Sequence, residues 1–266
     1  MVLNKPETIV LRKEGGVATI SLNRPEVRNA INLPMIRELT KAIQELNKLE
    51  GIRVIVFKSE GKHFCSGADL NWMASGLSQS ESQIKGESLD LANLFRLIWE
   101  AAAVTICSVS GPVPGGAIGL LAASDLVVAE SSVMLTFSEL KLGLIPATIA
   151  PYVLRKAGPG RSSDWMMTGR PIDSSEAKEA GLIHRICEEG SLEESTGLLV
   201  EELLSGGPGA LKGVKQMLRR IGGIRDPREV ATYTSGLITS FRISAEGQEG
   251  MKAFLEKRKP GWNEEQ

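Results

Sequence analysis

Two glycine-containing turns and one carboxylate have the residue types and spacing for chemistry in this 266-residue chain. One turn lies in residues 110–122 (SGPVPGGAIGLLA) and the other in residues 61–70 (GKHFCSGADL). Each places small residues between a hydrophobic strand and a helix start, where backbone N–H groups lack intrahelical acceptors. Two such turns can donate one N–H each to a single oxygen and stabilise an oxyanion. The alternative is that both are only structural turns.

The carboxylate is Glu139, in the segment FSELKLGLIP. Apolar neighbours in the sequence are expected to raise its pKa, because burial disfavours the charged form. A glutamate tuned in this way can both accept and donate a proton near neutral pH. These neighbours are Leu135, Phe137, Leu140 and Leu142. The alternative role for Glu139 is to cap a helix.

The 110–122 turn lies inside a run without charged residues, residues 101–124, that has the length of a membrane span. Pro112 and Pro114, together with four glycines, would break a spanning helix. The run is therefore predicted to form a buried strand over residues 104–110, a turn, and a buried helix that starts near Gly115. No membrane association is expected.

The composition excludes several classes of protein. Net charge is −1, from 31 Lys and Arg against 32 Asp and Glu, so no basic field favours nucleic acid. With only two histidines, His63 and His184, a zinc site is not expected. Three cysteines without framework spacing suit a reducing compartment. The first 16 residues lack signal-peptide or transit character, so we expect a cytoplasmic protein.

Strands and helices alternate over the first two thirds of the chain, and the last third is helical. The predicted strands cover residues 9–12, 17–22, 54–58, 104–110, 125–129, 133–137 and 182–186. Helices are predicted after an Asn32 cap and over residues 80–100 and 173–181, then over 192–205, 210–221, 227–241 and 246–257. This order predicts an α/β core over residues 1–190 and a C-terminal helical region over residues 191–266.

Several motifs in this order resemble the crotonase, or enoyl-CoA hydratase/isomerase, superfamily. They are NRPEVRNAIN, HFCSGADLNWM, SGPVPGGAIGL, FSELKLGLIP, GRPIDSSEAKEAGLI and AFLEKRKPGW, and they span essentially the whole chain. The resemblance implies an α/β fold, a ClpP-like spiral of ββα units, with a C-terminal helical region that builds a homotrimer or a hexamer. It implies an acyl-CoA thioester substrate, as in fatty acid metabolism, and no metal or other cofactor beyond the coenzyme A of the substrate.

Matched by motif, the resemblance assigns roles to individual residues. The amides of Ala68 and Gly116 would form the oxyanion hole, and Glu139 would move protons. The residues expected along the coenzyme A and the acyl path are Arg28, Ala30, Ala68, Asp69, Leu70 and Asn71, with Phe254 and Lys257 reaching it from the tail of a neighbouring subunit. Alternatively, Arg28 and Lys257 are solvated charges, Asp69 caps a helix, His63 is a loop residue and Cys65 fills the core.

The chain departs from the family pattern at Gly119, where hydratases that use two glutamates carry the first of them. With one carboxylate left, Glu139 would serve both ends of a hydration, or would shuttle one proton between two carbons, which is double-bond isomerisation. The motifs are most similar to bacterial methylglutaconyl-CoA hydratases and short-chain enoyl-CoA hydratases. The resemblance therefore favours a hydratase, a lyase, over an isomerase, and both over a non-catalytic acyl-CoA-binding protein.

Overall fold

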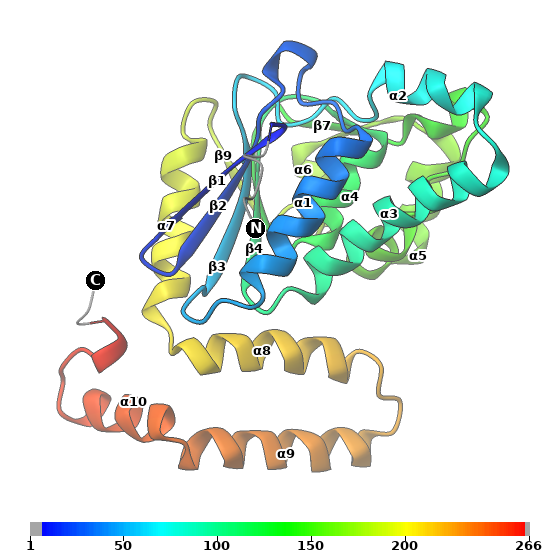
Figure 1. Cartoon of the computed structure of the whole chain (residues 1–266). Coiled ribbons are helices and arrows are strands. Elements are labelled where there is room, and N and C mark those ends of the chain that lie inside the picture. Colours follow the sequence, from blue (N-terminus) through cyan, green and yellow to red (C-terminus); the bar gives the residue numbers. More distant parts are fainter. Residues whose placement is uncertain (1–6, 264–266) are drawn as a thin grey trace.

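A six-stranded sheet forms the centre of the computed structural model, which describes residues 7–263 (Figure 1). Its strand order is β1-β2-β3-β4-β6-β9, and only the β1-β2 pair is antiparallel. The strands are β1 (Ile9–Glu14), β2 (Val17–Leu22), β3 (Val54–Ser59), β4 (Val104–Val109), β6 (Leu126–Glu130) and β9 (Arg185–Cys187). The first six residues, part of the segment used for the targeting expectation, lie outside the described chain.

A second sheet of three short strands follows the order β5-β7-β8, with β5 (Val113–Pro114), β7 (Met134–Thr136) and β8 (Pro171–Asp173). β5 comes directly after β4, and β7 directly after β6, so these two strands of the large sheet are each followed by a strand of the small sheet. A helix comes next in the chain in each case, as the expected ββα units require. The sequence did not indicate β5 or β8, because strands this short carry no readable periodicity.

Helices cover both faces of the large sheet (Figure 1). On one face α1 (Leu33–Leu46), α3 (Glu81–Glu100), α4 (Ile118–Ala123) and α5 (Ala150–Thr168) pack in succession. On the other face α7 (Leu192–Ser205) packs on β3, β4 and β6, where Leu199 and Leu204 join a buried cluster with strand residues. The short helices are α2 (Leu70–Ser75) and α6 (Ser174–Glu179), and the 3₁₀ turns are η1 (Pro25–Val27), η2 (Gly76–Ser78), η3 (Gly115–Ala117), η4 (Ser138–Leu142) and η5 (Gly261–Asn263).

Local signals explain where the main helices begin. The Asn32 side chain accepts a hydrogen bond from the Met35 N–H at 3.0 Å, which confirms the predicted cap of α1. Ser80 and Gln83 form a capping box at the start of α3. The spacing of apolar residues over 80–100 predicts that the buried side of this helix consists of Leu89, Leu91, Leu94, Leu97 and Ile98. This prediction is partly wrong, because Leu89 is exposed, whereas Phe95, which it omits, is fully buried beside Leu94 and Ile98.

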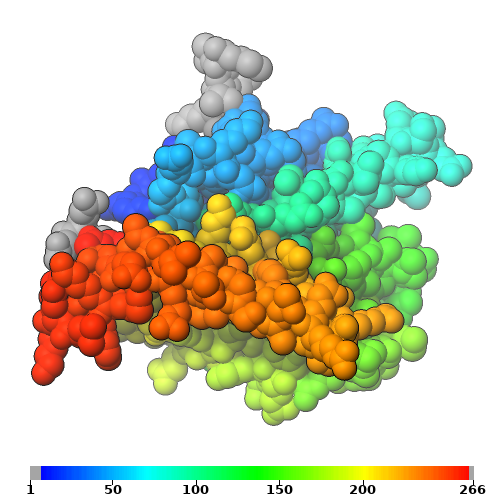
Figure 2. Space-filling view, turned by 90° about the horizontal axis from the view of Figure 1, so that it is seen from below, coloured from blue at the N-terminus to red at the C-terminus, as the bar shows by residue number. Residues whose placement is uncertain are grey.

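The C-terminal arm consists of α8 (Pro208–Ile221), α9 (Pro227–Ile243) and α10 (Ala245–Leu255). It runs below the sheet, and Figure 2 shows it crossing that face of the molecule. Every residue of α9 is at least partly exposed in the single chain. Apolar side chains on the arm are open to solvent, namely Val214, Leu218, Ile238, Ile243, Met251, Phe254 and Leu255.

Helix α5 was not predicted, because Gly158 and Pro159 interrupt its pattern. Gly158 has φ +73°, and the helix bends there before continuing to Thr168. No helix within residues 7–263 is long and apolar enough to cross a membrane, which agrees with the interpretation of residues 101–124 as a strand, a turn and a helix. Cys65, Cys107 and Cys187 are free thiols, and Cys65 is fully buried in the core.

Candidate active site

The two glycine-containing turns lie against each other. The Phe64 N–H donates a hydrogen bond to the Ser110 carbonyl oxygen at 3.0 Å. A Cβ atom added to Gly67 would lie 3.0 Å from the Pro114 carbonyl oxygen, which is tighter than an ordinary contact. Glycine at position 67 therefore allows the 61–70 turn to approach the 110–122 turn closely.

Each predicted oxyanion amide follows a glycine in the left-handed region. Gly67 precedes Ala68 and has φ +88°, and Gly115 precedes Gly116 and has φ +55°. This backbone conformation, which glycine adopts without steric penalty, sets the orientation of the peptide that follows. Within residues 7–263 neither the Ala68 N–H nor the Gly116 N–H donates to a protein acceptor. Both groups are therefore available to an oxygen of a ligand.

The backbone on both sides of Ala68 is fixed by a bridge to Ile31. The Ile31 N–H donates to the Gly67 carbonyl oxygen at 2.7 Å, and the Asp69 N–H donates to the Ile31 carbonyl oxygen at 2.8 Å. Gly116 is held differently, in the 3₁₀ turn η3 that leads directly into the buried helix α4. The helix predicted to start near Gly115 thus begins as a 3₁₀ turn and becomes an α-helix at Ile118.

Glu139 lies in η4 and reaches the 110–122 turn. Its Oε1 atom is 3.3 Å from the position that a Cβ atom on Gly115 would take, and Gly115 immediately precedes the predicted oxyanion amide. Its Oε2 atom is buried and meets no hydrogen-bond donor among the described residues. Burial raises the pKa of Glu139, and a hydrogen bond from its own backbone N–H opposes the shift only partly.

The predicted rise of the Glu139 pKa is confirmed, but part of the reasoning behind it is wrong. Leu140 and Leu142 are exposed and do not enclose the carboxyl group. The other two predicted neighbours, Leu135 and Phe137, are fully buried, and the Glu139 carboxyl group lies against Gly115 of the 110–122 turn.

Apolar side chains fill the space in front of Gly119. A Cβ atom added to Gly119 would lie 2.6 Å from both Phe95 Cε1 and Ile149 Cγ2, and it would overlap the Phe95 ring. Phe95 comes from α3 and is fully buried, and Ile149 precedes α5 and is 1% exposed. A second carboxylate at position 119 therefore has no room in this fold.

The residues of the first loop and of the SGADLN segment that are expected along the coenzyme A lie around the 61–70 turn. Arg28 is exposed and has φ +53°, whereas Ala30 is buried and its carbonyl oxygen already accepts a hydrogen bond from Arg24. Leu70 and Asn71, at the start of α2, are exposed. Arg28 is thus the charged side chain of this set with freedom to reach a ligand.

Asp69 has a structural role, which the sequence left as an alternative. Its Oδ1 atom accepts hydrogen bonds from the N–H groups of Asn71 and Trp72, so it caps α2. Its Oδ2 atom accepts from Arg24 at 2.9 Å. Both oxygens of the carboxylate are therefore occupied within the fold.

Phe254 and Lys257 are not brought to the two turns within the single chain. Both are exposed, on or just after α10, which packs on α9 at the far end of the arm (Figure 1). Their expected contact with coenzyme A from a neighbouring subunit stays a prediction.

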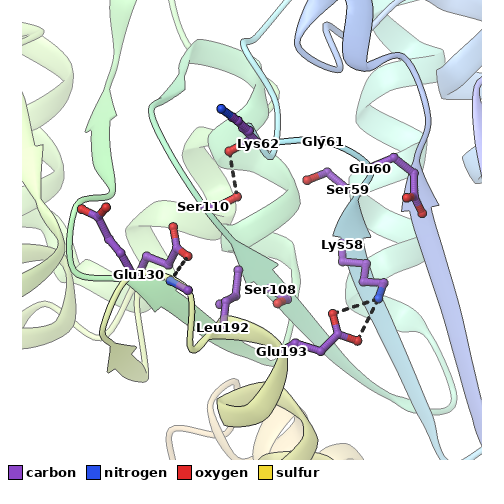
Figure 3. A pocket seen from close by; sticks show the side chains of 12 residues that line it. Lys58, Ser59, Glu60, Gly61, Lys62, Ser108, Ser110, Glu130, Leu192 and Glu193 are labelled. Atoms are coloured by element: carbon purple, nitrogen blue, oxygen red, sulfur yellow. Dashed lines mark hydrogen bonds and ion pairs between the residues drawn. The ribbon is translucent and has the colours of Figure 1, made fainter.

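A surface pocket of about 490 Å³ lies on the α7 side of the two turns (Figure 3). Its lining carries charges of both signs, and Lys58 pairs there with Glu193 at 3.0 Å. The pocket contains none of the predicted oxyanion or proton-transfer groups. Because catalysis needs those groups together, the two turns and the adjacent Glu139, and not this pocket, form the candidate site.

The structure agrees with the alternative roles of His63 as a loop residue and of Cys65 as a core residue. The His63 carbonyl oxygen accepts a hydrogen bond from the Asn29 side chain at 2.8 Å, and the His63 side chain packs against Gly111. Burial raises the pKa of the Cys65 thiol to about 12, so it is an inert core residue. Cys65 therefore adds no reactive thiol to the site.

Three residues at the site were not singled out from the sequence. No sequence pattern singles out Phe95 or Ile149, and only the fold shows that they face Gly119. Arg24 lies in the polar first loop, yet its side chain is only 17% exposed and binds Asp69. The NRP motif of the first loop was the available signal for Arg24, but its partner lies 45 residues away.

The arrangement combines two free amides with one carboxyl group of raised pKa. Free N–H groups from two turns can stabilise the negative oxygen of an enolate, and an adjacent carboxyl group can add or remove a proton. The chemistry available to the site is therefore proton transfer next to a carbonyl group.

Comparisons with known proteins agree with this chemistry. The family model described as enoyl-CoA hydratase/isomerase matches residues 12–265. The solved structure of an enoyl-CoA hydratase from Shewanella pealeana superimposes with a TM-score of 0.91 at 34% identity, covering 97% of each chain. The enoyl-CoA hydratase AKT6-1 of Alternaria alternata is 30% identical over 249 residues, which cover 93% of this chain and 81% of that protein.

A trans-2-decenoyl-[acyl-carrier-protein] isomerase of Streptococcus mutans is also similar, with 28% identity over 254 residues, or 95% of this chain and 96% of that protein. The chain belongs to the enoyl-CoA hydratase/isomerase family, and it has the crotonase fold. The resemblance inferred from the sequence motifs is confirmed.

Proposed function

We propose that this protein moves a carbon–carbon double bond in an enoyl-CoA thioester, with Glu139 as the proton carrier. The observation that supports the proposal is the pair formed by Glu139 and Gly119: one carboxyl group borders the oxyanion turn, and the second position is filled by Phe95 and Ile149. Isomerisation needs a single proton carrier, which Glu139 supplies. A hydration that uses two glutamates needs the second one at position 119, where Phe95 and Ile149 fill the space.

In the proposed reaction the Glu139 carboxylate removes a proton from C2 of a 3-enoyl thioester. The electron pair moves toward the thioester carbonyl and gives a dienolate, whose oxygen accepts hydrogen bonds from the Ala68 and Gly116 N–H groups. The protonated Glu139 then returns the proton to C4, and the double bond lies between C2 and C3. The raised pKa of Glu139 makes its carboxylate a stronger base for the first step.

The substrate is proposed to be an acyl-CoA, as the family membership supports. Arg28, exposed beside the 61–70 turn, would meet the phosphates of coenzyme A, and the backbone from Ala68 to Asn71 would line the path of the ligand. No metal or redox cofactor enters the proposal, because the coenzyme A belongs to the substrate.

The second candidate is hydration of a 2-enoyl-CoA, including 3-methylglutaconyl-CoA. It is favoured by the relatives from Shewanella pealeana and Alternaria alternata, whose names give that activity. In this case Glu139 would activate water and later protonate the α-carbon. The names of the relatives support both reactions, since the Streptococcus mutans relative is an isomerase.

The assembly is proposed to be a homotrimer or a dimer of trimers. The support from the structure is the arm, on which every residue of α9 is at least partly exposed and Ile243, Phe254 and Leu255 are open to solvent. Apolar surface of this kind is characteristic of protein interfaces. Phe254 and Lys257 would reach the coenzyme A of an adjacent subunit in such an assembly.

The test is to incubate the protein with trans-3-hexenoyl-CoA in water enriched in heavy oxygen and to identify the products by mass. The proposal predicts a conjugated 2-enoyl-CoA of unchanged mass. A hydratase would leave this unconjugated thioester unchanged and would instead convert trans-2-hexenoyl-CoA to a 3-hydroxyacyl-CoA that carries heavy oxygen. Binding of both thioesters without turnover of either, across a panel of chain lengths, would identify a non-catalytic protein and contradict both candidates.

A further inference from the structure

Arg24 links two segments that meet at the candidate oxyanion hole. It stands directly before η1, and its side chain is only 17% exposed. Its Nη1 atom donates to the Ala30 carbonyl oxygen at 2.6 Å, and its Nη2 atom donates to Asp69 Oδ2 at 2.9 Å. One guanidinium group therefore holds both the first loop and the 61–70 turn.

The two acceptors of Arg24 flank the bridge that fixes Ala68. Ile31, which follows Ala30, exchanges backbone hydrogen bonds with Gly67 and Asp69 on either side of Ala68. The planar guanidinium closes this bridge from the side, because its two nitrogens bind the residue before Ile31 and the residue after Ala68. Its geometry fixes the separation of the two segments, and with it the direction of the Ala68 N–H.

The charges of the pair support the same role. Burial alone would raise the pKa of Asp69, but hydrogen bonds from Arg24 and from the N–H groups at the start of α2 outweigh it and lower that pKa. The aspartate is therefore ionised and fully engaged, with one oxygen on Arg24 and the other on the cap of α2. The nitrogens Nη1 and Nη2 of Arg24 are likewise committed to protein acceptors.

We infer that Arg24, through its bonds to Ala30 and Asp69, is a positioning residue that aligns the Ala68 amide toward the thioester oxygen. The inference rests on the proposed function, since it assumes that this amide binds that oxygen. It differs from the role expected for Arg28, because Arg24 acts on the backbone and makes no contact with substrate. Loss of Arg24 is therefore expected to weaken polarisation of the bound thioester more than it weakens binding.

The test compares Arg24→Met and Asp69→Asn with the control Arg37→Met, which removes an exposed arginine of α1 whose nearest carboxylate is 3.9 Å away. Asp69→Asn keeps an oxygen for the cap of α2 but loses the charge that Arg24 binds. The spectroscopic probe is cinnamoyl-CoA, because hydrogen bonds to its carbonyl oxygen shift its absorption to longer wavelength when it binds. This shift is read without turnover, so it reports on the oxyanion hole even where the proposed isomerisation fails.

Both site variants are expected to bind cinnamoyl-CoA with a smaller shift than wild type, at an affinity within about threefold, and kcat is expected to fall about tenfold with KM little changed. Arg24→Lys is expected to recover part of the shift, because an amine can satisfy one of the two acceptors. A full shift and wild-type kcat in both variants would overturn the inference, whatever their thermal stability. A rise in KM alone would also overturn it and would assign Arg24 to binding. If Arg24→Met does not fold, the absorption shift of cinnamoyl-CoA bound to Arg24→Lys and to Asp69→Asn tests the inference instead.

Discussion

The ring of Phe95 occupies the space into which a side chain at position 119 would extend. A Cβ atom on Gly119 would lie 2.6 Å from Phe95 Cε1, and Ile149 closes the same space from another side. The glycine and the phenylalanine therefore form one packing unit that joins α4 to α3. The space that a glutamate at position 119 would need is not empty, because the buried side chains of Phe95 and Ile149 occupy it.

This packing predicts that Gly119→Ala is destabilising. Overpacking of this kind lowers the free energy of unfolding by about 1–3 kcal/mol. The matched control is Gly86→Ala in α3, where an added Cβ meets no atom within 4 Å and alanine should stabilise the helix by about 0.5–1 kcal/mol. Chemical denaturation of both variants measures the difference, and equal stabilities would contradict the packing described.

A second prediction concerns the glycine beside Glu139. Gly115→Ala should lower kcat, because its Cβ would lie 3.3 Å from Glu139 Oε1 and would displace the carboxyl group. Gly143→Ala is the control: φ at Gly143 is +70°, so the backbone strain is similar, but no atom lies within 4 Å of the added Cβ. Steady-state kinetics should show about a tenfold or larger loss for Gly115→Ala alone. Equal losses in both variants would assign the effect to strain.

Both glycine-containing turns, Glu139 and most elements follow from the sequence, because glycine spacing, caps and periodicity are local signals. The helix face of α3 was only partly predicted, since Leu89 and Phe95 differ in what packs on them and not in hydrophobicity. The contact of Phe95 with Gly119 and that of Arg24 with Asp69 join segments far apart in the chain. Such contacts depend on the fold, so no local sequence pattern predicts them.

The raised pKa of Glu139 has consequences for activity and for stability. Because the carboxylate is the proposed base, kcat/KM should rise with pH through a pKa above the ordinary value of 4.5. In the folded chain the group keeps its proton at pH values where the unfolded chain has lost it. Its contribution to the free energy of unfolding therefore falls as pH rises from the unfolded pKa to the folded pKa.

Glu139→Gln removes the loss of stability that ionisation of the buried carboxyl group causes as pH rises. The variant should gain thermal stability relative to wild type at pH 7, and the gain should shrink near pH 4, where the wild-type carboxyl group is protonated. Thermal melts of the two proteins across this range measure the effect. A gain that does not change with pH would show that ionisation of Glu139 costs no stability.

A fourth prediction concerns the attachment of the arm to the core. Asp125 Oδ2 lies 2.5 Å from the Lys215 ammonium of α8, and Lys215 is only 6% exposed. Asp125→Asn leaves this ammonium buried without its counter-charge, which should cost about 3–5 kcal/mol. The exposed pair of Arg185 with Glu202 is the control, since Glu202→Gln should change stability by less than about 1 kcal/mol. Faster amide exchange confined to α8 and the rest of the arm would locate the effect, and equal stabilities of the two variants would contradict it.

The most direct measurement is turnover of trans-3-hexenoyl-CoA by Glu139→Gln, with binding of the same thioester measured by calorimetry. Glutamine keeps the shape of the side chain and cannot carry the proton. The account predicts that kcat falls by about 10²–10⁴-fold while the dissociation constant stays within about threefold of wild type. A Glu139→Gln variant that binds the thioester and still turns it over at the wild-type rate would contradict the assignment of Glu139 as the proton carrier.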